Sequence, residues 1–366
     1  MTSSFLYLSA LLLAIIASVS AQTFTDCNPL NKTCPAAPAL GTNHTWVFNQ
    51  TQDDKIWNIT TGEIQYDDEG AHLVIAEKLQ SPTMQSTFHI FFGIVETHVK
   101  MAAGAGIVSS VVLQSADLDE IDWEWVGSNT GEVQSNYYGK GDDSTYDRGG
   151  YHAVANADTE FHNYTTHWTA EKTEWWIDNN LVRTLTFDEA QNGTRYPQTP
   201  SNVRIGIWPA GDSGNNHGTI EWAGGEVDYD AGPYTMVVQS CRVHDFHTGK
   251  EYEYGDHSGT WESINVVDGN STAVEEINKP PEKSLSEKWD EIPNGGKIGV
   301  YVGAAAVGAM LIALFIFFCI RKRRQGRLEH ALGDAQYNTE RTEMNNFQSD
   351  WKQSEWNHKG GYQQVR

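Results

Sequence analysis

The chain has 366 residues, of which 48 are acidic and 25 basic, and a formal net charge of −23 at pH 7. The segment from Gln22 to Lys297 holds 42 acidic and 16 basic residues, which excludes nucleic acid as a partner. The four cysteines have no metal-ligand spacing, and we expect neither a metal nor a cofactor.

The N-terminal region predicts secretion. Phe5 to Ser20 is an uncharged apolar run followed by Ala21, and small residues there suit signal-peptidase cleavage, so we expect residues 1–21 to be a signal peptide. Cys27 and Cys34 are close enough for a small disulfide-closed loop. A secreted domain also fits seven glycosylation sequons, at Asn31, Asn43, Asn49, Asn58, Asn163, Asn192 and Asn270.

Residues 22–258 have the pattern of an all-β domain. Short strand-like runs alternate with Gly, Asn and Asp turns, as in 174–177 and 181–184 around Asp178-Asn179-Asn180. No long amphipathic helix is predicted there. We therefore expect one sandwich of two antiparallel sheets.

The run from Asp119 to Glu124 contains the most informative pattern in the domain. A β-strand would place Glu120, Asp122 and Glu124 on one face and leave the apolar Ile121 and Trp123 on the other. Crowded carboxyls repel, so one keeps a proton while another ionises, which is the pair that glycoside cleavage requires. The alternative is a solvated acidic face, which the apolar opposite face disfavours.

The spacing of the two glutamates favours a retaining mechanism. At the rise of a strand their Cα atoms are about 13 Å apart, and the side chains can lean toward each other to the roughly 5–5.5 Å carboxyl separation of retaining enzymes. Glu120 would then be the nucleophile, Glu124 the acid/base and Asp122 the group that holds the nucleophile. The longer inverting separation stays open.

Other residues are candidates for sugar contacts. Gln134 and Asn136 alternate along a second run and Lys140 follows in a turn, so they could bind hydroxyls or decorate an outer face. Arg204 and Trp208 would share a face opposite an apolar pair, as in a lined cleft. We also expect a strand at 218–222, with Trp222 as a further aromatic contact.

The C-terminal part predicts a membrane anchor. Residues 259–297 are polar and contain Pro280 and Pro281, as in an extracellular stalk. The 23 uncharged residues 298–320 suffice to cross a bilayer, and the basic run 321–324 places the following side in the cytoplasm. We expect a single-pass type I protein of the plasma membrane with a disordered tail, 321–366. A buried core helix and a glycolipid-anchor signal fit less well.

The acidic run Glu120 to Glu124 resembles the ExDxE signature of glycoside hydrolase family 16, and the wider chain resembles its fungal Crh-type cell-wall transglycosylases. The motifs that carry this resemblance are 81–83, 106–110, 113–115, 118–126, 146–149, 196–200 and 218–225, together with the Cys27 to Cys34 loop.

The resemblance implies a β-jelly roll and a retaining enzyme that cuts chitin and transfers the new end to β-glucan or chitin, cross-linking the wall. It implies sugar contacts at Arg204, Trp208, Thr219 and Trp222. A hydrolase of β-glucan or chitin without transfer and a non-catalytic polysaccharide receptor are the alternatives. The sequence leaves the oligomeric state open.

Overall fold

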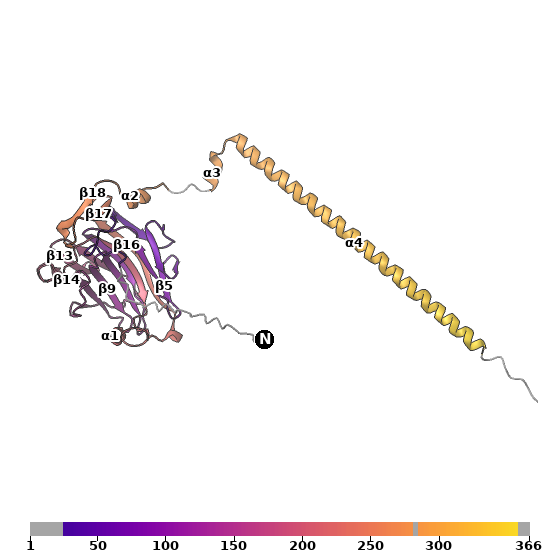
Figure 1. Cartoon of the computed structure of the whole chain (residues 1–366), viewed down its shortest axis with the longest axis horizontal. Helices are drawn as coiled ribbons and strands as arrows, with labels where there is room; N and C mark the ends of the chain where they lie inside the picture. The colour runs from indigo at the N-terminus through magenta and orange to yellow at the C-terminus, as the bar shows by residue number, and fades with distance from the viewer. Residues whose placement is uncertain (1–24, 281–284, 358–366) are drawn as a thin grey trace, which may run out of the picture. The chain divides into compact units, whose positions relative to one another are not determined.

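A computed structural model of the chain describes residues 25–280 and 285–357 and divides into two compact units, one ending at Lys279 and one beginning at Pro280 (Figure 1). The predicted signal peptide, 1–21, lies outside the described residues.

The first unit is the predicted sandwich of antiparallel sheets. One sheet has seven strands, in the order β11 (Gly150–Ala153), β10 (Glu132–Tyr138), β9 (Glu120–Val126), β8 (Val108–Ser115), β15 (Ser201–Trp208), β6 (Thr83–Ser86) and β3 (Trp57–Thr61). The other runs β14 (Asn180–Thr186), β13 (Lys172–Ile177), β12 (His162–Trp168), β7 (Gly93–Lys100), β16 (Tyr234–Asp245), β5 (Ala71–Ile75) and β4 (Ile64–Tyr66), and β2 (Asn43–Val47) also pairs with β16.

Smaller elements lie at the two ends of the sandwich. A three-stranded sheet joins β1 (Ala37–Pro38), β17 (Glu251–Tyr254) and β18 (Ile264–Val267). Figure 1 shows α2 (Thr272–Ile277) near this sheet and α1 (His217–Trp222) at the opposite end. Two short 3₁₀ turns occupy Tyr229–Ala231 and Trp261–Ser263.

Period-two alternation in β9 builds the core. Ile121, Trp123 and Trp125 are at most 2% exposed, and the rings of Trp123 and Trp125 lie edge-on to Tyr164 of β12, with centroids 5.5 and 4.6 Å away. Burying one such indole removes roughly 150–250 Å² from water, which contributes about 4–6 kcal/mol before chain entropy is subtracted. Trp175 of β13 donates its indole N–H to the Asp122 carbonyl at 3.3 Å. The strand is therefore clamped by its apolar face.

The predicted hairpin between residues 174 and 184 is confirmed. Strands β13 and β14 are antiparallel neighbours, and the turn residues Asp178 and Asn179 both have positive φ, 48° and 64°. Asp and Asn tolerate this conformation, and its twist matches that of the flanking strands.

The predicted domain boundary at 258 is wrong. Ile264 of β18 and Ala273 of α2 are 8% and 4% exposed and belong to the main core. Ser271 caps α2 by accepting a hydrogen bond from Val274 N–H and donates its hydroxyl to the Leu40 carbonyl at 2.8 Å. Residues 259–279 are thus part of the folded unit, not of a stalk. Their polar composition conceals a few apolar anchors, which is why the sequence pattern missed them.

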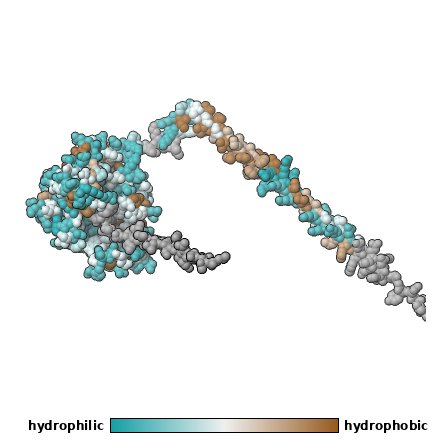
Figure 2. Space-filling view, viewed as in Figure 1, coloured by the Kyte–Doolittle hydropathy of each residue, from teal (hydrophilic) through white to brown (hydrophobic). Residues whose placement is uncertain are grey.

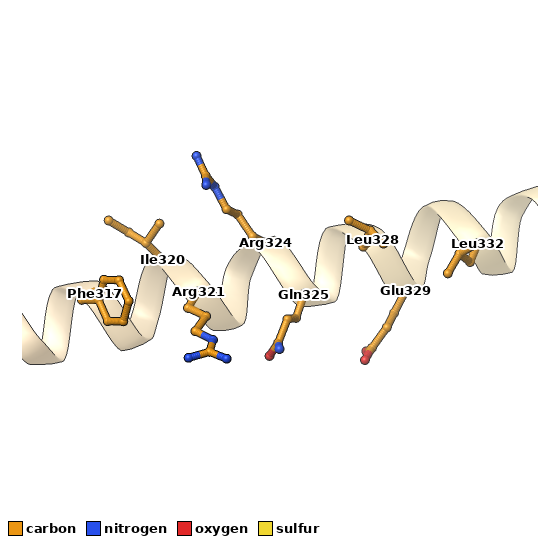
Figure 3. Close-up of a pocket in the computed structure, with 8 residues that line it drawn as sticks. All are labelled: Phe317, Ile320, Arg321, Arg324, Gln325, Leu328, Glu329 and Leu332. Carbon is orange, nitrogen blue, oxygen red and sulfur yellow. The ribbon is translucent and has the colours of Figure 1, made fainter.

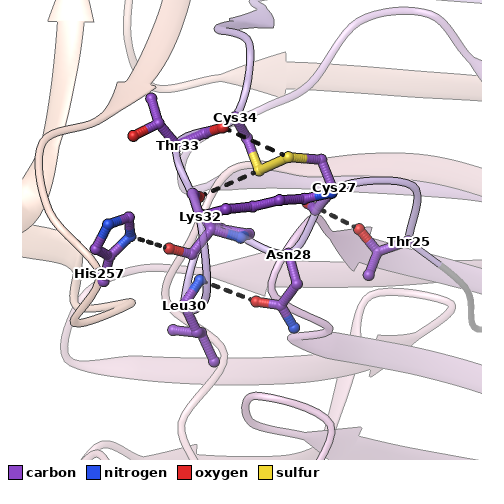
Figure 4. Close-up of a disulfide and its surroundings, with 9 residues drawn as sticks. Thr25, Cys27, Asn28, Leu30, Lys32, Thr33, Cys34 and His257 are labelled. Carbon is purple, nitrogen blue, oxygen red and sulfur yellow. Dashed lines mark hydrogen bonds between the residues drawn. A yellow bond between two sulfur atoms is a disulfide. The ribbon is translucent and has the colours of Figure 1, made fainter.

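The disulfide between Cys27 and Cys34 is confirmed, with Cα atoms 5.8 Å apart (Figure 4). Within the loop, Leu30 donates its backbone N–H to the side chain of Asn28 at 2.9 Å. The ring of His257 donates to the Pro29 carbonyl, so a residue near the end of the domain fastens the loop at its beginning.

The second unit consists of α3 (Leu285–Glu291) and the 64-residue α4 (Asn294–Asn357). Helix α4 contains residues 298–320 and is the one helix in the described part that is long and apolar enough to cross a membrane, by length and composition. Its apolar stretch is brown in Figure 2. The disorder predicted for 321–366 differs from the structure, in which the helix continues to Asn357. That segment lacks proline and is rich in Arg, Glu and Gln, which favour helices.

A shallow hollow lies along α4 among Phe317, Ile320, Arg321, Arg324, Gln325, Leu328, Glu329 and Leu332 (Figure 3). All eight side chains project from one helix, and no second element of the described residues closes the hollow. We therefore assign no binding site to it.

Candidate active site

The three predicted acids lie on β9, an interior strand of the seven-stranded sheet, between β10 and β8. The predicted strand is confirmed. It pairs with β10, with Glu120 opposite Tyr138, Asp122 opposite Asn136, and Glu124 opposite Gln134. Directly paired residues share a face, so the acids and the predicted polar contacts of β10 form three cross-strand rows. The structure thus brings Gln134 and Asn136 beside the acids.

On its other side, β9 pairs with β8, which leads to β15. Glu124 faces Ser110, and Ser110 in turn faces Gly206. These two small residues lie between the rows of Arg204 and Trp208, which pair with Val112 and Val108. Because Ser110 and Gly206 have small side chains and their neighbours have larger ones, the side chains beside Glu124 project less from the sheet. A ligand chain crossing the strands could lie there.

The acids are held in a poorly solvated setting. Asp122 is 2% exposed, whereas Glu120 and Glu124 are partly exposed. Burial raises the pKa of Asp122 to about 6, although a hydrogen bond with Glu120 and the charges of Arg183 and Arg148 oppose that rise. Burial also raises the pKa of Glu120 and of Glu124 well above the usual range, and the negative charge of Asp122 raises each further.

The three carboxyls titrate as a linked group, in which burial and mutual repulsion favour retaining protons. The hydrogen bond between Asp122 and Glu120 lets one proton be shared by that pair. Gln114 of β8 donates its side-chain amide to Glu120 at 3.4 Å. The site therefore contains one group suited to donate a proton and one suited, once deprotonated, to attack.

Lys140 does not join the acid rows. It follows β10 with a positive φ of 56°, and its backbone N–H donates to Asp119 at 2.9 Å. Burial raises the pKa of Asp117 and of Asp119, and the Lys140 ammonium group opposes that rise. The Lys140 Cε lies 3.0 Å from where a Cβ on Gly259 would stand. The side chain is thus directed toward the turn before β9, a placement that depends on the chain beyond residue 258.

The strand predicted at 218–222 is wrong, because these residues form the helix α1. Trp222 nevertheless comes to Trp208: their rings are stacked with centroids 6.1 Å apart, over a small cluster with Val108 and Ala223. Trp208 is 6% exposed and Trp222 is partly exposed, so Trp222 presents the more accessible ring. Thr219 lies one turn earlier on α1 and is partly exposed.

Two arginines near the site were not predicted. Arg148, in the loop between β10 and β11, is 6% exposed and lies over the ring of Tyr138 at 4.4 Å. Arg183 of β14 donates to the carbonyls of Ser135 and Arg148 at 2.7 Å each. The charges of both oppose the rise that burial causes in the pKa of Asp122. Arg148 lies in the motif 146–149 quoted above, which was the only sequence signal for it.

The seven sequons are not equivalent in the fold. Six of the asparagines are exposed. Asn163 of β12 is partly buried, donates its side-chain amide to Glu96 at 3.0 Å and accepts from Thr165, the hydroxyl residue of its own sequon, at 2.8 Å. Both halves of its amide are therefore engaged within the protein.

An antiparallel sandwich with three linked carboxyls on one sheet is the arrangement of a glycoside-cleaving enzyme. Residues 51–224 match the family model described as glycosyl hydrolases family 16. The chain is 66% identical over 363 residues to Crh-like protein 3 of Aspergillus fumigatus, covering 99% of each protein. It is 49% identical over 346 residues to a Crh-like protein of Arthroderma benhamiae, covering 94% of this chain and 93% of that protein.

A solved structure described as Crh5 transglycosylase in complex with NAG is 47% identical, with a TM-score of 0.64, covering 66% of this chain and 99% of that one. The chain belongs to the Crh-like proteins of glycosyl hydrolase family 16. It is accordingly a glycosidase or transglycosylase with a jelly-roll fold.

Proposed function

We propose that the protein is a retaining transglycosylase that cleaves chitin and transfers the new chain end to β-glucan or to chitin in the fungal wall. The observation that carries this is the trio of buried or half-buried acids on β9, each with a polar cross-strand neighbour. The relative solved with NAG, whose polymer is chitin, supports the substrate class.

In the proposed first step, deprotonated Glu120 attacks the anomeric carbon while Glu124 gives its proton to the leaving oxygen. Asp122 would hold Glu120 in place and accept its proton before attack, which their shared hydrogen bond allows. In the second step, Glu124 takes the proton of an acceptor hydroxyl, whose oxygen attacks the same carbon and releases Glu120 as a carboxylate. A sugar acceptor gives transfer, and water gives hydrolysis.

The test uses the full-length chain in detergent, chitin oligomers and a labelled β-1,3-glucan oligomer. Transfer yields labelled hybrids whose new linkage keeps the configuration of the cleaved bond, as read by NMR. Shortened chitin without hybrids would reject transfer and leave the hydrolase alternative. Inverted products would reject Glu120 as nucleophile.

The receptor alternative is tested by removing the nucleophile. Glu120→Gln should leave binding of chitin oligomers intact and abolish turnover. Glu132→Gln changes a glutamate of the neighbouring strand β10 and serves as the matched control. Unchanged biological activity of the Glu120→Gln protein in cells would instead favour a non-catalytic receptor.

We further propose a single-pass type I topology in the plasma membrane, with residues 298–320 as the span and the catalytic unit facing the wall. The basic run 321–324 supports this orientation. Protease added to intact wall-less cells should remove the catalytic unit and spare the C-terminal segment. Release of the active unit from cells as its main form would contradict a membrane-bound enzyme.

A further inference from the structure

The two sides of β9 offer different surfaces to a ligand. Toward β15 lie Arg204 and the stacked pair of Trp208 and Trp222. Toward β10 and β11, the row that starts at Glu124 continues through Gln134 to Tyr151. Because paired residues share a face, Tyr151 lies on the same face as Glu124, two strand spacings or roughly 10 Å away.

Tyr151 is unusually accessible for a sheet residue on this face. It is 57% exposed on the edge strand β11, whereas Gln134 between it and Glu124 is 8% exposed. Tyr146, five residues earlier, is 83% exposed. Single exposed aromatic residues are common on protein surfaces. Tyr151 lies on the edge strand β11 and Tyr146 in the loop that joins β10 to it, and core burial explains neither ring.

The loop that carries Tyr146 is held firmly. The Arg195 guanidinium is 2.6 Å from the Asp142 carboxylate and also donates to the hydroxyls of Ser144 and Thr145. Arg148 donates to the carbonyls of Asp142 and Thr145, at 2.7 Å each. Side chains and backbone of the loop are thus fixed by two separate guanidinium groups.

The end of the same loop is tied to the sheet. The Arg148 carbonyl accepts a hydrogen bond from Arg183, and the Arg148 guanidinium lies over Tyr138, which is the cross-strand partner of Glu120. An aromatic ring on a backbone held this way loses little entropy on binding a ligand. The loop is therefore a fixed support for Tyr146.

We propose that Tyr151 and Tyr146 form the acceptor subsite, which stacks the C–H face of a β-linked glucan or chitin oligosaccharide on the Glu124 side of the sheet. This inference rests on the proposed transglycosylase function. A polysaccharide crossing the strands is cut above β9, so its two parts lie on opposite sides of that strand. Arg204 and the stacked rings of Trp208 and Trp222 lie on the β15 side, which assigns the covalently held donor to that side.

The second step then takes place between the two surfaces. The acceptor hydroxyl gives its proton to the Glu124 carboxylate, and its oxygen forms the new bond to the anomeric carbon. The ester bond to Glu120 breaks, and its electron pair leaves with the Glu120 carboxylate. Rings of Tyr151 and Tyr146 hold the acceptor, so that its hydroxyl competes successfully with water at that carbon.

The experiment compares Tyr151→Ala, Tyr146→Ala and the double variant with Tyr151→Phe, which keeps the ring. Phe246→Ala removes a 41% exposed ring that lies edge-on to two histidines of the other sheet and is the matched control. The full-length chain is assayed for hydrolysis of a chitin oligomer alone and for transfer to a β-1,3-glucan oligomer. Thermal melting verifies folding.

The alanine variants should raise the acceptor concentration needed for half-maximal transfer by about tenfold, while hydrolysis of the donor alone stays within about twofold. Tyr151→Phe and Phe246→Ala should behave like the unaltered protein. An equal loss of hydrolysis and transfer, or an unchanged acceptor dependence, would overturn the proposed subsite.

Binding separates this inference from the proposed function. In a Glu120→Gln background, where turnover is absent, NMR titration with the glucan oligomer should show weaker binding when Tyr151 or Tyr146 is alanine. If the unaltered chain forms no hybrids, the transfer proposal fails, and loss of binding in the tyrosine variants still supports a glucan subsite. Equal binding by all variants overturns it.

Discussion

Two groups of acids lie within eight residues of the chain, and they differ in burial and in the number of hydrogen-bond donors around them. Asp117 and Asp119, in the turn before β9, are fully buried. They accept hydrogen bonds from Ser115, Thr199, Gln198 N–H and Lys140 N–H, while Asp117 Oδ2 has no hydrogen-bond partner among the described residues. Glu120, Asp122 and Glu124 follow at once and have few donors. Acids that the protein buries and supplies with several donors maintain the fold, and acids left partly exposed with few donors are available for chemistry.

The largest difference expected between the two groups of acids is in their effect on turnover. Glu120→Gln and Glu124→Gln should each lower kcat by at least about 10³-fold, since the first removes the nucleophile and the second the proton donor. Melting temperatures should change little. The measurement is hydrolysis of a chitin oligomer by the purified chain. Retention of a tenth of the activity by either variant would contradict the role given to that residue.

The pH dependence of activity should reflect the linked ionisation of the three acids. Glu120 must be ionised and Glu124 protonated, so activity should be bell-shaped and peak on the acid side of neutrality. Asp122, with its pKa raised to about 6, contributes to the acid limb. Beyond each limb the rate should fall by about tenfold per pH unit. A profile that stays flat from mildly acid to alkaline pH would be incompatible with this assignment.

The buried pair Asp117 and Asp119 should show the reverse pattern, a loss of stability with little loss of activity. Asp119→Asn replaces an acceptor oxygen by an amide that faces other donors, which should lower the free energy of unfolding by about 1–3 kcal/mol. Activity per folded molecule should stay within severalfold of the original. Urea unfolding and an assay at low temperature measure the two effects. Unchanged stability would refute a structural role for Asp119.

The smallest expected effect is on the pH dependence of stability. Burial raises the pKa of Asp119 from 3.8 to about 7, and the charge of Asp117 adds to the rise. A raised folded-state pKa stabilises the protein below the unfolded pKa, and that stabilisation is lost as pH rises through the folded value. The melting temperature should therefore decline by a few degrees between about pH 4 and pH 8. In Asp119→Asn the decline should be shallower.

The alternation of polar and apolar residues within single strands was sufficient to predict which side chains share a face. The acids at 120, 122 and 124 could be placed on one face because the strand period is two and the intervening residues are apolar. Gln134, Asn136, Arg204 and Trp208 followed from the same period in their own strands. That these residues lie next to the three acids could not be predicted, because it depends on the order of the strands in the sheet, which the alternation does not specify.

The predictions that were wrong concern residues whose positions depend on contacts distant in the sequence. Trp222 comes to Trp208 from a six-residue helix instead of a strand, because ring stacking outweighs the weak strand pattern of 218–222. Lys140 turns toward Asp117 and Asp119, and this burial needs residues near Gly259. The end of the domain was misplaced because Ile264 and Ala273 are isolated apolar residues in a polar segment.

The contact between His257 and the Cys27 to Cys34 loop concerns biosynthesis as well as stability. The loop can close as soon as Cys34 reaches an oxidising compartment, but its partner is made more than two hundred residues later. Strands β8 to β11 are consecutive neighbours and can pair early, whereas β1 waits for β17 and β2 for β16. During vectorial synthesis, the catalytic sheet can therefore form before the chain's first segment has found its place.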